Sequence, residues 1–136
     1  MIINIEKEDY VTAKINFAKR AHELIKANDF RSYPTIKNLI SETNNGIVLT
    51  VLSALIKDFS KSFNVVRNIT ENQVIEVCVI LISQYEHLTI EDCIVLLEFA
   101  KSGRLTTVRD RIDVQVLLEI ITAYDEYRFP KKHFVI

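Results

Sequence analysis

Glycine and proline are scarce in this sequence, with two of each among 136 residues. Both residues interrupt regular structure, so a sequence this poor in them favours helices joined by short turns over a glycine-rich β architecture. The length is that of one ordinary domain with one core. We therefore expect residues 1–136 to form a single all-α domain, a compact helical bundle.

Long apolar runs are also missing. The two most apolar stretches, residues 46–56 and 78–82, fall well short of the roughly 18 consecutive apolar residues that a membrane-spanning helix needs. The first residues lack the basic segment, apolar segment and cleavage site of a secretory signal. These features predict a cytoplasmic protein that does not contact membranes.

The residue types that carry catalysis or bind metals are few and dispersed. Two cysteines, Cys78 and Cys93, cannot supply a four-ligand zinc site, and their apolar surroundings predict reduced core residues. The histidines at 22, 87 and 133 do not pair at a metal-ligand spacing, and the sequence has no phosphate-binding glycine loop, nucleophile elbow or HExxH motif. The sequence thus predicts no enzyme and no cofactor.

Helical periodicity and capping residues predict about six helices. They are expected over residues 8–28, 35–44, 47–63, 71–87, 90–102 and 114–128. The spacing of Thr70 and Gln73 is that of a capping box, and Thr89 and Asp92 repeat it. Gly103 can take the left-handed conformation that often ends a helix.

The apolar pattern also predicts which helices are central. The segment 47–63 is apolar nearly all round its first three turns, and we place it at the centre together with 71–87. The side chains expected to be almost fully buried are Leu52, Leu55, Val77, Leu81, Leu97, Leu117 and Ile121. The apolar chain ends, residues 1–5 and 133–136, either pair as a small edge sheet, pack together on the bundle, or fray.

Charge is distributed unevenly, although the formal net charge is only -1. Residues 1–41 carry 7 basic and 5 acidic side chains, residues 42–100 carry 3 and 8, and residues 101–136 carry 7 and 5, so the nets are +2, -5 and +2. A protein that tracks nucleic-acid backbones usually has a large basic excess, which this chain lacks. A local basic patch is still compatible with this distribution.

The candidate interaction surface comes from the loop 101–113 and the C-terminal end. Its members are Lys101, Arg104, Arg109, Arg111, Arg128, Lys131 and Lys132. Asp110 and Asp113 lie among the arginines, which favours ion pairs that brace the loop over contacts with phosphate. We expect Arg111 to be structural and Arg104 and Arg109 to face outward, toward a protein partner.

The order of these elements resembles an uncharacterised family of small helical proteins carried by phages and other mobile elements of Bacteroidetes. The resemblance covers residues 33–128 and rests on Pro34-Thr35 before a short helix, Lys101-x-Gly103-Arg104 after the fifth, Asp113, and a final Arg128. In that family the loop after Gly-Arg tends to be aromatic and rich in glycine, whereas here it carries Leu105, Thr106, Val108 and Arg109. The resemblance implies a phage or mobile-element accessory protein.

Two hypotheses on function follow. The first is a non-enzymatic adaptor that binds a protein partner or self-associates, for instance in replication or transcription. It is favoured by a mean hydropathy of +0.13, which is high for a small monomer and points to apolar surface reserved for contact. The second is an accessory protein that binds nucleic acid through the basic loop and the C-terminal tail; the near-zero net charge and the missing loop aromatics oppose it.

Overall fold

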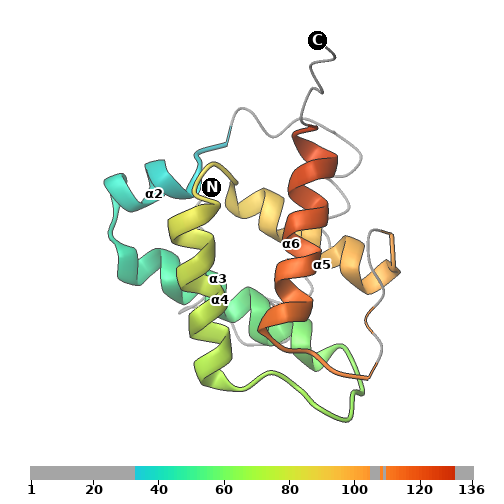
Figure 1. Ribbon diagram of the computed structural model, residues 1–136. Helices are drawn as coiled ribbons and strands as arrows, with labels where there is room; N and C mark the ends of the chain where they lie inside the picture. Colours follow the sequence, from blue (N-terminus) through green and yellow to red (C-terminus); the bar gives the residue numbers. More distant parts are fainter. Residues whose placement is uncertain (1–32, 105–107, 109, 131–136) are drawn as a thin grey trace.

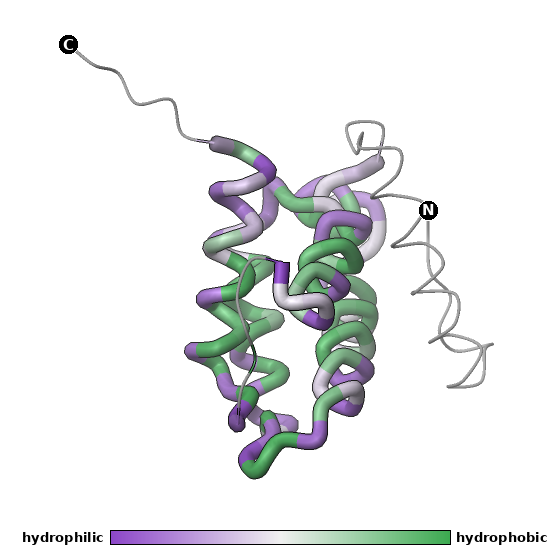
Figure 2. The backbone as a smooth tube through the Cα atoms, turned by 90° about the vertical axis from the view of Figure 1, so that its right-hand side faces the viewer, coloured by the Kyte–Doolittle hydropathy of each residue, from purple (hydrophilic) through white to green (hydrophobic). Residues whose placement is uncertain are grey.

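The described part of the chain, residues 33–104, 108 and 110–130 of a computed structural model, is helical and contains no strand (Figure 1). Its helices are α2 (Ile36–Glu42), α3 (Asn45–Lys61), α4 (Glu71–Gln84), α5 (Ile90–Ser102) and α6 (Val114–Arg128). In Figure 1, α4 and α6 form a front pair, and α3 and α5 run across behind them. Figure 2 gives the same arrangement from the side, with apolar and polar segments alternating along the helices.

The predicted helix starts are confirmed at Thr35, Thr70, Thr89 and Asp113, whose side chains cap their helices. Helix α3 differs from the predicted 47–63: the Asn44 side chain caps it, so it begins at Asn45 and ends at Lys61. Thr70 Oγ1 accepts from the Gln73 amide at 3.3 Å while the Gln73 side chain accepts from the Thr70 amide at 2.9 Å, which completes the capping box. Thr89 and Asp92 form a second box at the start of α5. Gly103 ends α5 with φ of 71°, in the left-handed region where glycine avoids the steric cost that a Cβ brings.

The end of α4 differs from the prediction. The helix stops at Gln84, three residues before His87, because the chain turns there and its backbone bonds to α2 instead. The Ile36 amide donates to Leu88 O at 2.7 Å and the Lys37 amide donates to Glu86 O at 3.1 Å. The first amides of a helix have no partner within it, so this loop satisfies two of them.

The core contains every side chain predicted to be deeply buried: Leu52, Leu55, Val77, Leu81, Leu97, Leu117 and Ile121. The predicted position of the helices needs one correction. The most enclosed helix is α5, with ten of its 13 residues buried, whereas α4 exposes Ile75 and Val79 by 48% and 52%. Thus α4 is a surface helix, and α5 rather than α4 accompanies α3 in the interior.

Two predicted features lie outside the described residues: the helix over 8–28 and the pairing of residues 1–5 with 133–136. The six-helix count and the pairing of the ends therefore stay predictions. Within the described residues, β pairing is limited to isolated bridges between Thr35 and Thr89 and between Arg67 and Arg111. None of the helices found there has both the length and the hydropathy of a bilayer span.

Candidate functional site

The predicted basic surface is divided between two ends of α6. Arg111 precedes the first turn of α6 and Arg128 closes its last turn, so the helix separates them by about 1.5 Å per residue over its full length. Lys101 and Arg104 lie at the C-terminal end of α5. The remaining three, Arg109, Lys131 and Lys132, lie outside the described residues.

Arg111 braces the loop, as predicted. Its Nε lies 2.9 Å from Asp113 Oδ2, while Asp113 Oδ1 accepts from the Val116 amide and caps α6. The adjoining backbone is fixed as well, because the Ile112 amide donates to Arg67 O at 2.8 Å. This end of the loop is therefore built into the fold.

The cations at the end of α5 also have neighbours within the chain. Lys101 Nζ lies 3.8 Å from Glu98 Oε2, one turn earlier. The Arg104 guanidinium is 4.5 Å from the centroid of the Phe99 ring, a cation–π distance, while its side chain stays exposed. The Arg104 guanidinium thus lies against an aromatic ring at the surface.

Aromatic rings contact Arg104 and Arg128 at two separate places. The rings of Phe99 and Tyr127 meet edge to face at 5.7 Å, and the Arg128 guanidinium lies 5.0 Å from the Phe129 ring. Tyr127 is 57% and Phe129 40% exposed. We call Phe99, Arg104, Tyr127, Arg128 and Phe129 the aromatic–arginine cluster.

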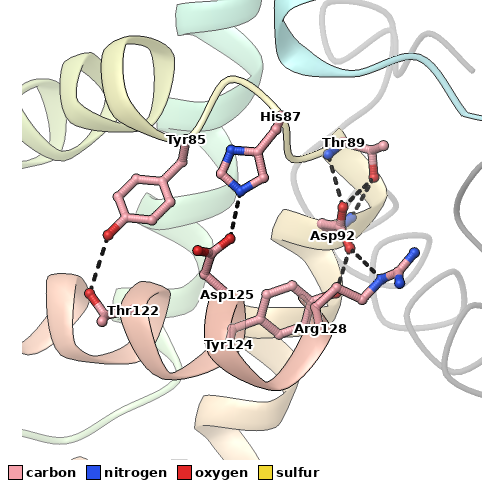
Figure 3. Close-up of polar contacts among 8 residues, drawn as sticks. All are labelled: Tyr85, His87, Thr89, Asp92, Thr122, Tyr124, Asp125 and Arg128. Carbon is pink, nitrogen blue, oxygen red and sulfur yellow. Dashed lines mark hydrogen bonds and ion pairs between the residues drawn. The ribbon is translucent and has the colours of Figure 1, made fainter. Parts of the chain in front are cut away.

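A buried carboxylate fixes the helix that carries this cluster (Figure 3). Asp92, 1% exposed, accepts from the Thr89 amide at 3.0 Å, from the Thr89 hydroxyl at 3.2 Å and from the Tyr124 hydroxyl at 2.5 Å. Arg128 Nε lies 3.5 Å from Asp92 Oδ1. These contacts lock the last turns of α6 onto the first turn of α5.

A second row of contacts ties α6 to the connection after α4 (Figure 3). The hydroxyls of Tyr85 and Thr122 are 3.2 Å apart, and His87 Nε2 lies 2.6 Å from Asp125 Oδ1. The His87 ring also meets the Phe129 ring edge to face at 5.4 Å. The end of α6 is therefore held from two sides.

Burial governs the titration of the groups in the interior. It raises the pKa of the Tyr124 hydroxyl, with the charge of Asp92 and the hydrogen bond to Asp92 adding to the effect and Arg128 opposing it. Burial likewise raises the pKa of the Cys93 and Cys78 thiols, which are both free. Neutral thiols are weak nucleophiles, so these cysteines pack as small apolar groups, as predicted.

The exposed aromatic and arginine side chains are suited to noncovalent binding. Among the described residues, no three histidine, cysteine, aspartate or glutamate side chains are grouped so that they could hold a metal ion. The candidate site is a partly exposed group of aromatic rings and guanidinium groups.

Sequence reasoning identified Arg104 and Arg128 but missed their aromatic neighbours. Tyr127 and Phe129 stand beside Arg128 in the sequence, and that spacing was the available signal. The contact of Tyr127 with Phe99 and that of Phe129 with His87 depend on how α6 packs against the rest of the chain, which no local pattern reveals.

Comparison of the chain with protein-family models, with curated proteins and with solved structures finds no match.

Proposed function

We propose that this chain is a non-enzymatic adaptor that binds a protein partner through the aromatic–arginine cluster. The observation that carries the proposal is the exposure of Tyr127 and Phe129, by 57% and 40%, together with two arginines, Arg104 and Arg128, that lie on the rings of Phe99 and Phe129. Tyrosine and arginine are enriched among the residues that dominate protein interfaces. Single exposed apolar residues are ordinary, but a fixed group of this composition is typical of an interface.

The contacts beneath the cluster support the same function. The Asp92 network and the His87–Asp125 pair hold the end of α6 in place, so little side-chain freedom is lost when a partner binds. Such preorganisation increases affinity without adding contacts.

The biological setting of the proposal comes from the resemblance to the family of Bacteroidetes phages and mobile elements. An accessory protein of such an element works in the bacterial cytosol, for instance in replication or transcription, where small adaptors redirect larger assemblies.

Nucleic acid is the alternative partner, and one observation favours it. Arginine beside exposed aromatic rings also suits single-stranded nucleic acid, whose bases stack on such rings. The ion pairs of Arg111, Arg128 and Lys101 oppose it, because carboxylates within 4 Å reduce the positive potential that phosphates require.

Affinity capture from host cells with the full chain tests the adaptor. The double variant Arg104→Ala/Tyr127→Ala should lose the captured partner, whereas Ile75→Ala/Val79→Ala, which truncates two exposed residues of α4, should keep it. Equal capture by both variants would contradict the proposal.

A titration with duplex and single-stranded DNA at low salt separates the two hypotheses. We expect no saturable binding to either form. Micromolar or tighter binding that is lost in Arg104→Ala/Arg109→Ala, and that weakens steeply with salt, would show that the loop is a nucleic-acid site instead.

A further inference from the structure

A small pocket lies between α3 and α5, two helices that pack against each other. Its volume is about 20 Å³, and both helices contribute apolar side chains to its walls, Leu55 and Phe59 from α3 and Ile94 from α5. A cavity needs roughly 10 to 15 Å³ to hold one water molecule. The pocket therefore accepts a single group of about that size.

A buried carboxylate lines this pocket without a partner of its own. Asp58 is 6% exposed, and its Oδ1 has no hydrogen-bond partner among the described residues. None of the ion pairs found in that part of the chain includes Asp58. Burial of an uncompensated carboxylate is costly, so the pocket favours a group that brings a positive charge and hydrogen-bond donors.

The charges around the pocket leave one negative charge uncompensated. Glu98 and Lys101 line it together with Asp58, and Lys101 Nζ lies 3.8 Å from Glu98 Oε2. Lys57 and Lys61, the lysines of α3, are not among the residues that line the pocket. Two carboxylates therefore face one ammonium group, and a second cation would balance them.

The size of the pocket decides which cation fits. An ammonium group is a compact cation, about as large as a water molecule, with N–H bonds that can donate to several acceptors, whereas a guanidinium group is wider and planar. Divalent metal ions take roughly six or more oxygen ligands. In the part of the chain that the structure describes, no three side chains of the metal-binding types are grouped to supply them.

We propose that the pocket between α3 and α5 binds a primary ammonium group, such as the end of a lysine side chain, through Asp58 and Glu98. The inference goes beyond the adaptor function and does not depend on it. A lysine of another protein and a free amine share this chemistry, and the experiment separates the two sources.

NMR spectra of the isotope-labelled full chain, titrated with methylammonium chloride at constant total salt, test the site. The amide signals of residues that line the pocket, such as Ile94 and Leu97, should shift saturably. Tetramethylammonium carries the same charge but has no N–H donor and is too large, so it should cause no saturable shift there.

A second ligand identifies the source of the ammonium group. Nα-acetyl-lysine N-methylamide presents the group at the end of a lysine side chain. Saturable shifts with this compound would indicate that a protein lysine is the ligand, and shifts with methylammonium alone would indicate a free amine.

Variants of the chain locate the binding. Asp58→Asn removes the charge but keeps the size of the side chain, and it should weaken methylammonium binding at least about tenfold. Asp110→Asn makes the same change at an exposed position and should bind like the wild type. Circular dichroism checks that each variant keeps its helices, and Glu98→Gln replaces Asp58→Asn if the latter unfolds.

Three results would overturn the proposal. The first is the absence of saturable shifts with methylammonium, which would mean that the pocket holds only water. The second is equal binding by Asp58→Asn and the wild type. The third is an ion pair of Asp58 with Lys101 in solution, which would appear in urea denaturation as a loss of stability in Asp58→Asn that disappears in the Lys101→Met background.

The variant Arg104→Ala/Tyr127→Ala should bind methylammonium like the wild type, because neither residue lines the pocket. Failure of this site and failure of the aromatic–arginine cluster are therefore separate results.

Discussion

The carboxylate of Asp92 shows how a single residue can be buried and still stabilise the fold. Burying an unpaired charge costs several kcal/mol, but Asp92 accepts three hydrogen bonds, from the Thr89 amide and hydroxyl and from the Tyr124 hydroxyl. Arg128 supplies the nearby positive charge. The residue therefore joins α5 to α6 by polar contacts inside an apolar core.

Removal of the Tyr124 hydroxyl should weaken this contact between α5 and α6. Tyr124→Phe leaves Asp92 with one donor fewer, and we expect the free energy of unfolding at pH 7 to fall by about 1 to 3 kcal/mol. Urea denaturation measures this loss. Tyr127→Phe alters an exposed tyrosine that does not contact Asp92, and it should change the free energy of unfolding by less than about 0.5 kcal/mol.

The same hydroxyl should make stability depend on alkaline pH. In the folded state the pKa of Tyr124 is raised above its ordinary value of 10.0 by burial and by Asp92. The unfolded chain therefore loses this proton first, and the stabilisation that is complete below pH 10 declines above it. Each further pH unit should cost about 1.4 kcal/mol.

Urea denaturation between about pH 10 and 11.5 checks this dependence. In Tyr124→Phe the free energy of unfolding should decline less steeply with pH, because the contribution of one proton is missing. The curve of Tyr127→Phe should follow that of the wild type. The cysteines Cys78 and Cys93, whose pKa values are also raised, contribute the same decline to all three proteins. Identical slopes for wild type and Tyr124→Phe would show that Tyr124 does not stay protonated in the folded state.

At the scale of the element, two helices with the same capping pattern differ in their surroundings. Thr70 at the start of α4 is exposed, whereas Thr89 at the start of α5 is 4% exposed and also donates its hydroxyl proton to Asp92. The sequence alone gives both the same cap. Burial makes the second one part of the core.

Alanine substitution should separate the two caps. We expect Thr70→Ala to lower the free energy of unfolding by about 1 kcal/mol, the ordinary value of a cap. Thr89→Ala should lower it by about 2 kcal/mol or more, because a buried acceptor also loses a partner. Chemical denaturation of the two variants side by side makes the comparison; equal losses would mean that burial adds nothing at Thr89.

The elements themselves were largely predictable because their ends are local. Thr35, Thr70, Thr89 and Asp113 each cap the helix that the sequence assigned to them, and α6 spans the predicted Val114–Arg128. The end of α4 was predicted three residues too late, since it depends on backbone bonds from α2 to residues 86 and 88. A distant segment decides that boundary, and no pattern within α4 indicates it.

At the scale of the whole molecule, the core carries the stability. Leu81 is 3% exposed, while Val79, two residues earlier on the same helix, is 52% exposed. We expect Leu81→Ala to lower the free energy of unfolding by about 2 to 5 kcal/mol, through lost burial and the cavity that remains. Val79→Ala should change it by less than about 0.5 kcal/mol.

Thermal and urea denaturation of these two variants tests the arrangement of the core. A loss of 2 to 5 kcal/mol is a large share of the stability of a small domain. An unchanged midpoint for Leu81→Ala, or similar losses for both variants, would contradict the orientation of α4.

The sequence by itself determined the helical class, most helix ends, the buried leucines and the ion pair of Arg111 with Asp113. These features depend on periodicity, caps and near neighbours, which act over a few residues. Only the tertiary structure decided that α5 is the enclosed helix and that Tyr127 stands against Phe99, whose ring also contacts Arg104. It also placed Asp92 under Tyr124, 32 residues away. Such contacts depend on how helices cross, and the crossing is set by the packing of the whole core rather than by any single segment.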